Sequence, residues 1–120
     1  MEQYEINGFI NQLKKCDCMR EDLIPKIKAD LIKSDLIREE HCRVLPYGIE
    51  IEVLTDNGDK PVYFMIDLNS ISLRLNPNKS SKAFWTIDLY SFFNNYEEGI
   101  KKFLLNVGFY ISFCNKGLYK

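Results

Sequence analysis

A run of residues that alternates between apolar and polar side chains constrains this chain most. Residues 49–54 read IEIEVL, so the isoleucines and the valine fall on one face while Glu50 and Glu52 fall on the other. A two-residue period of this kind is typical of a strand with one packed face and one face in water. The sequence therefore predicts a half-buried strand here, the first of three between Arg43 and Leu75.

The next run is predicted to pair with the first in a hairpin. Residues 55–61 interrupt the alternation, and Asn57-Gly58 supplies the positive backbone angles that a tight reversal requires. Residues 62–68 are largely apolar on both faces, so we expect them at the centre of a sheet. Residues 71–75 alternate again, and Pro77 ends this third strand.

Helical patterns are found on both sides of these strands. Residues 6–15 and 20–38 carry apolar side chains at helical spacing. Pro25 lacks an amide proton and fits best in a first turn, so the second helix is expected to begin near Leu23 or Ile24.

The C-terminal third is predicted to mix both kinds of element. Residues 84–89 alternate as a fourth strand, and residues 90–93 either prolong it or turn into a helix. A helical stripe over residues 96–107 stops at Gly108, and residues 109–113 alternate as a last strand. The sequence predicts an α+β fold: N-terminal helices followed by a mainly antiparallel sheet of four to five strands, with one further helix before the last strand.

Composition indicates one soluble domain over residues 1–120. The hydrophobic share of 46% and the aromatic share of 13% argue against disorder. The net charge of −1 gives no overall field to attract nucleic acid or anionic lipid. With no bilayer-spanning apolar run and no N-terminal signal segment, we expect a cytoplasmic protein that binds neither membranes nor nucleic acid directly and keeps its thiols reduced.

Few residues of the sequence indicate catalysis or metal binding. Four residues are potential zinc ligands, but their spacing matches no known zinc pattern: Cys16, Cys18, His41 and Cys42. We therefore expect no metal and no cofactor, and His41, the only histidine, is interpreted as a surface or capping residue. No phosphate-binding glycine loop or nucleophile elbow is present.

Carboxylates provide the remaining route to an enzyme. Glu50 and Glu52 share a strand face, and Asp67 and Asp88 lie on neighbouring predicted strands. Such a cluster would suit general acid–base or metal-assisted hydrolysis, but charged residues on the wet face of a strand are ordinary. A small carboxylate-dependent hydrolase is therefore the less favoured alternative, and the chain is predicted not to be an enzyme.

Size, composition and element order give a resemblance. A small acidic α+β chain, rich in aromatic residues and carboxylates, resembles the immunity proteins that neutralise bacterial polymorphic or contact-dependent toxins. The resemblance implies stoichiometric binding of a cognate toxin, for example a nuclease, and occlusion of its active site. Acidic residues would complement a basic groove and tyrosines would anchor the contact. The partner-binding residues implied are Glu50, Glu52, Asp56, Asp59, Tyr63, Asp88, Tyr90, Glu97 and Glu98.

A second binding function remains open. Dimeric secretion-chaperone-like proteins that hold a client segment are also small acidic α+β proteins, and the sequence does not separate a monomer from a homodimer.

Overall fold

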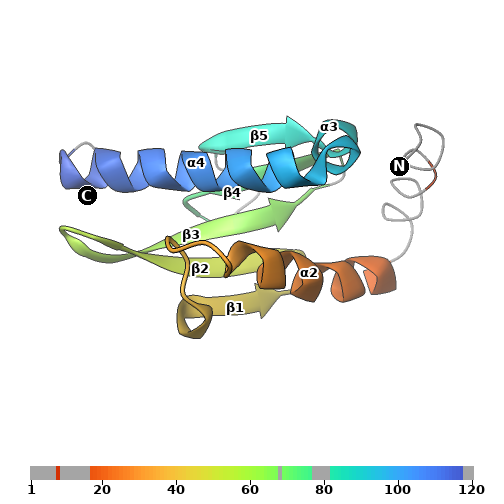
Figure 1. The fold of residues 1–120 in the computed structure, drawn as a ribbon, viewed down its shortest axis with the longest axis horizontal. Helices are drawn as coiled ribbons and strands as arrows, with labels where there is room; N and C mark the ends of the chain where they lie inside the picture. Colours follow the sequence, from red (N-terminus) through yellow and green to blue (C-terminus); the bar gives the residue numbers. More distant parts are fainter. Residues whose placement is uncertain (1–7, 9–16, 68, 77–81, 118–120) are drawn as a thin grey trace.

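The computed structural model describes residues 8, 17–67, 69–76 and 82–117, which form an antiparallel sheet with helices packed on it (Figure 1). The prediction of an α+β fold is confirmed: α2 precedes the sheet, and α3 and α4 follow it. The elements in chain order are α2 (Asp17–Leu31), η1 (Glu39–His41), β1 (Cys42–Leu45), β2 (Gly48–Thr55), β3 (Gly58–Ile66), β4 (Ser70–Arg74), β5 (Trp85–Asp88), α3 (Leu89–Asn94) and α4 (Tyr96–Asn115).

Each strand of the sheet pairs with its neighbour in the sequence. The spatial order is β1-β2-β3-β4-β5, and all four pairings are antiparallel. The longest is the predicted hairpin of β2 and β3, in which Ile51 lies opposite Val62. Gly58 has a φ of +99°, so the predicted turn at Asn57-Gly58 is confirmed and needs glycine at this position.

One face of the sheet packs against α2 and α4, which lie on the same side in Figure 1. Ile49, Ile51 and Val53 of β2 point into this core, and all three are buried. At the centre, the ring of Phe64 lies 5.0 Å from that of Phe103 and 5.9 Å from that of Phe92, measured between centroids. The central position predicted for residues 62–68 is therefore confirmed, since β3 is the middle strand and carries the ring that touches both C-terminal helices.

The predicted last strand over residues 109–113 is wrong, because these residues continue α4 to Asn115. Phe103, Val107, Tyr110 and Cys114 recur every three or four positions and are all buried against the core. The alternation of residues 109–113 is real, but the helical stripe buries more apolar surface. Gly108 does not end the helix.

The predicted start of the second helix is also wrong. Helix α2 begins at Asp17, so Pro25 lies in its interior, and it ends at Leu31 instead of continuing to residue 38. Pro25 is exposed, on the opposite side from the buried Ile24 and Ile27, so the lost backbone hydrogen bond does not disturb the packed face.

Three short segments complete the comparison with the sequence. Strand β1 was not predicted, because its four residues show no repeated alternation. Residues 90–93 belong to helix α3, since Asp88 caps its first turn. The predicted helix over residues 6–15 falls, except for Gly8, outside the described residues.

Candidate functional site

The face of the β2–β3 hairpin that points away from α2 and α4 gathers several predicted site residues. Glu50 and Glu52 share this face of β2, as predicted, because Ile49, Ile51 and Val53 between and beside them are buried in the core. Leu54 follows on the same face, directly opposite Asp59 of β3. We call Glu50, Glu52, Leu54 and Asp59 the hairpin face.

A row of directly opposed residues crosses the sheet beside the hairpin face. Arg43 of β1 lies opposite Glu50, Glu50 opposite Tyr63, and Tyr63 opposite Arg74 of β4. Arg43 Nη2 donates to Glu50 Oε2 at 3.2 Å. Burial, together with a hydrogen bond to Glu50, raises the pKa of Tyr63. Tyr63 is only 8% exposed, so it supports the row from within the sheet and offers little surface for the anchor role predicted for it.

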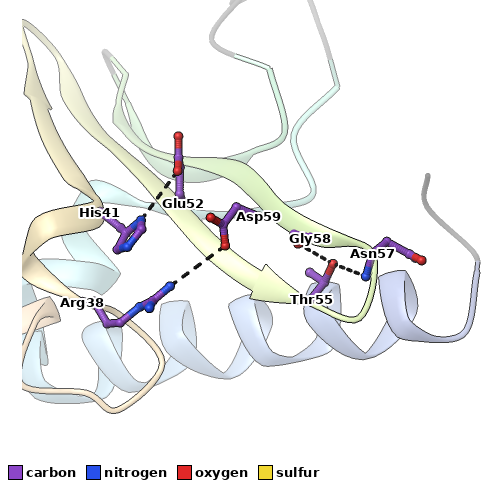
Figure 2. Close-up of polar contacts among 7 residues, drawn as sticks. All are labelled: Arg38, His41, Glu52, Thr55, Asn57, Gly58 and Asp59. Carbon is purple, nitrogen blue, oxygen red and sulfur yellow. Dashed lines mark hydrogen bonds and ion pairs between the residues drawn. The ribbon is translucent and has the colours of Figure 1, made fainter.

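A second group of polar side chains lies where η1 approaches the hairpin face (Figure 2). His41 Nδ1 lies 3.6 Å from Glu52 Oε2, and Arg38 Nη2 lies 4.0 Å from Asp59 Oδ1. One potential ligand atom each of His41, Glu52 and Asp59 falls within 4.8 Å of the other two. The sequence placed Glu52 and Asp59 on the hairpin but gave no sign that the segment before β1 would bring His41 to them.

The loop between β2 and β3 is held by its own side chains. Thr55 Oγ1 donates to the carbonyl of Gly58 at 2.8 Å and accepts from the amide of Asn57 at 3.1 Å, as Figure 2 shows. Asn57 Nδ2 in turn donates to the carbonyl of Cys114 in α4 at 2.9 Å. Asp56, a predicted site residue, is exposed on this loop. The loop is held by hydrogen bonds within itself and by a hydrogen bond to α4.

The remaining predicted site residues lie elsewhere, around α3 and the first turn of α4. Asp88 accepts from the amide of Ser91 at 2.9 Å and from its hydroxyl at 2.6 Å, and these bonds lower the pKa of Asp88. This carboxylate is a helix cap. Tyr90 is half-buried, and Glu97 and Glu98 are exposed. The predicted set thus divides into two groups on different elements.

The carboxylate cluster considered for hydrolysis is also divided. Asp67 Oδ2 accepts from Ser72 at 3.1 Å and lies 3.5 Å from Arg74 Nη2. Asp88 caps α3, so neither aspartate joins Glu50 and Glu52 on the hairpin face. Both carboxylates have structural partners, so no catalytic role is needed to explain why they are present.

The thiols of the described cysteines have partners or burial of their own, although Cys42 borders the same shallow pocket as Glu50 and Glu52. Cys42 donates from its thiol to the carbonyl of Arg38 at 3.4 Å, and burial raises its pKa, so the thiol form is favoured. Cys114 is buried in the core, and neither residue is in a disulfide. Of the other potential zinc ligands, Cys16 and the side chain of Cys18 lie outside the described part of the chain.

Leu54 is the residue of the site that sequence reasoning missed. Leu54 is 63% exposed and lies at the end of the hairpin face, next to Glu52 and opposite Asp59. The signal was available, because Leu54 continues the polar side of the alternation after Glu50 and Glu52.

Comparisons with protein-family models, with curated proteins and with solved structures each find no match. Within the described ranges, no helix has the length and apolar character needed to cross a membrane.

Proposed function

We propose that this chain is a non-enzymatic protein-binding module, an immunity protein that neutralises a cognate toxin by stoichiometric binding and occlusion of the toxin's active site. The observation that carries the proposal is the exposed Leu54, an apolar side chain that lies next to Glu52 and opposite Asp59 on the hairpin face. An apolar centre with a charged rim is the usual composition of a specific protein interface.

The charge of the surface around the hairpin face indicates the chemistry of the partner. Carboxylates outnumber Lys and Arg over residues 38–60, which hold the acidic residues Glu39, Glu40, Glu50, Glu52, Asp56 and Asp59 and the basic residues Arg38, Arg43 and Lys60. A surface of this sign attracts a basic groove and repels a phosphate backbone. A nuclease toxin fits this description, because its active site must itself attract nucleic acid.

Rigidity supports the same function. The loop of the hairpin is bonded within itself through Thr55 and tied to α4 through Asn57. A surface that is already ordered loses less conformational entropy when it binds, so more of the contact energy appears as affinity. The proposed interaction therefore needs no folding step on the side of this chain.

The test pairs the purified chain with the toxin encoded beside its gene. The expected result is a one-to-one complex and loss of toxin activity, with no turnover by this chain alone. Leu54→Ala is expected to weaken binding by about tenfold or more. The double variant Glu50→Gln, Asp56→Asn should associate with the toxin more slowly at low salt. Its association rate should also depend less on salt, because the long-range attraction that salt screens is reduced.

The matched control neutralises two other predicted site residues, through Glu97→Gln together with Glu98→Gln. These carboxylates are exposed on α4, and the proposal expects unchanged affinity. Equal losses in the control and in Leu54→Ala would contradict the hairpin face as the interface. A client-free dimer in sizing chromatography would favour the secretion-chaperone-like alternative, and turnover of nuclease or esterase substrates would favour the hydrolase.

A further inference from the structure

We propose that His41, Glu52 and Asp59 together form a binding site for a divalent transition-metal ion, with zinc as the ion that fits best. The site goes beyond the proposed function and does not depend on it. Each of the three residues offers one ligand atom, and these atoms lie within 4.8 Å of one another. They come from three different elements, η1, β2 and β3.

The backbone fixes the positions of these residues. Cys42 pairs with Ile51, so His41, one residue earlier, lies beside Glu52 at the same level of the sheet. Leu54 pairs with Asp59 and Glu52 pairs with Pro61, which makes Glu52 and Asp59 diagonal neighbours on one face of the hairpin. Strand pairing, and not a loose loop, therefore brings the donors together.

The distances suit a small ion. Zinc binds imidazole nitrogen and carboxylate oxygen at about 2.0–2.2 Å, which places the ligands of a tetrahedral site about 3.4 Å apart. His41 Nδ1 and Glu52 Oε2 are 3.6 Å apart, close to that separation. The other separations are at most 4.8 Å. They need a closure of at most about 1.4 Å, which rotation of the exposed side chains of Glu52 and Asp59 can supply.

The donor set indicates the class of metal. One imidazole with two carboxylates suits zinc, nickel or cobalt, whereas magnesium and calcium prefer oxygen ligands throughout. Three protein ligands leave at least one position for water or for a group from another molecule. An ion here would also offset the repulsion between the carboxylates of Glu52 and Asp59, which Arg38 offsets from 4.0 Å away from Asp59.

Arg38 would compete with a metal ion for the carboxylate of Asp59. Its Nη2 lies 4.0 Å from Asp59 Oδ1, and both side chains are more than 40% exposed. An exposed pair at this distance contributes little to stability, so a metal ion can replace it at small cost. The thiol of Cys42 is not part of the site, because it donates to the backbone carbonyl of Arg38.

The experiment measures binding of zinc to the full chain by isothermal titration calorimetry after treatment with a chelator. One ion per chain is expected at this site. His41→Ala and Asp59→Asn should each lower the affinity by about tenfold or more, since even residues behind the ligands of metal sites have effects of about 10–100-fold. All of these side chains are at least partly exposed, and circular dichroism checks that each variant is folded.

Two controls separate this site from other sources of binding. Glu50→Gln changes the neighbouring carboxylate on the same face and should leave the affinity unchanged. A variant with Cys16, Cys18 and Cys42 replaced by serine should also bind normally, and cobalt bound to either protein should show no thiolate-to-metal absorption band. Unchanged affinity in both His41→Ala and Asp59→Asn, or loss of binding in the serine variant, would overturn the proposal.

Discussion

The backbone amide of Asp56 donates to Asn115 Oδ1 at 2.7 Å, which joins the tip of the β2–β3 hairpin to the last residue of α4. A second bond, from Asn57 Nδ2 to the carbonyl of Cys114, lies beside it. The two partners of each bond are more than fifty positions apart in the sequence. The end of the helix therefore sets the position of the loop that carries part of the proposed interface.

Asn115→Ala should destabilise the fold, because it leaves the amide of Asp56 without its acceptor. The expected loss in the free energy of unfolding is about 1 kcal/mol, typical of one hydrogen bond. Urea denaturation measures it. Asn106→Ala is the matched control, since the side chain of Asn106 donates to the carbonyl of Lys102 within α4. An equal loss in both variants would contradict a role for the long-range bond.

Gly99→Ala and Gly108→Ala, both in α4, should have opposite effects on stability. A Cβ at Gly99 would lie 2.6 Å from Cδ2 of Phe92, whose ring is fully buried, so the core must shift at a cost of about 1–3 kcal/mol. At Gly108 the nearest atom is Leu36 Cδ1 at 4.0 Å. There alanine should stabilise the helix by about 0.5–1 kcal/mol. Thermal unfolding of the two variants compares them directly, and the prediction fails if both change stability in the same direction.

Pro25→Ala should stabilise the chain by about 1–2 kcal/mol, because it restores a backbone hydrogen bond in the interior of α2. Part of the gain is offset by the greater freedom of the unfolded chain without proline. A helix that began at Leu23 or Ile24 would have Pro25 in its first turn, where proline is favourable. A loss of stability in chemical denaturation would therefore support the shorter helix and contradict α2 as described.

Tyr96→Phe should lower stability and change its pH dependence. Tyr96 donates from its hydroxyl to Asp30 Oδ2 at 2.5 Å, and this bond lowers the pKa of Asp30. Burial, followed by Asp30, raises the pKa of Tyr96 above its usual value. The partly exposed bond is expected to contribute about 1 kcal/mol.

The direction in which stability changes with pH follows from these pKa shifts. The lowered pKa of Asp30 stabilises the fold above about pH 4, and that contribution is lost as the pH falls and the carboxylate is protonated. The raised pKa of Tyr96 stabilises the fold below about pH 10, and that contribution is lost as the pH rises toward the higher folded value. Urea denaturation of the unmodified chain and of Tyr96→Phe at pH 3, 5 and 7 should therefore show a difference in the free energy of unfolding at pH 5 and 7. This difference should shrink at pH 3. A difference independent of pH would contradict the ionised acceptor.

Sequence patterns predicted the hairpin because local chemistry determines it. Asn57-Gly58 fits a tight reversal, and the alternation of residues 49–54 fixes which side chains share a face. Residues 109–113 show the limit of this reasoning, since their side chains satisfy both a strand and a helix period. Packing of Tyr110 and Cys114 on the sheet, a tertiary effect, selects the helix.

The candidate site was only partly predictable for a similar reason. Alternation placed Glu50 and Glu52 together, but the approach of His41 depends on β1, a strand too short to give a pattern. Exposure of Leu54 depends on which face α2 and α4 leave uncovered. The approach of His41 is not contained in any local stretch of residues, whereas the alternation of residues 49–54 already puts Leu54 on the same face as Glu50 and Glu52.

The pairing of every strand with its neighbour along the chain has a consequence for synthesis on the ribosome. A meander has low contact order, so hairpins can form one after another as the nascent chain emerges. Helix α4 is made after all five strands, yet it covers the ring of Phe64. Until that helix docks, the growing polypeptide exposes an apolar face of the sheet, and aggregation is favoured most during this interval.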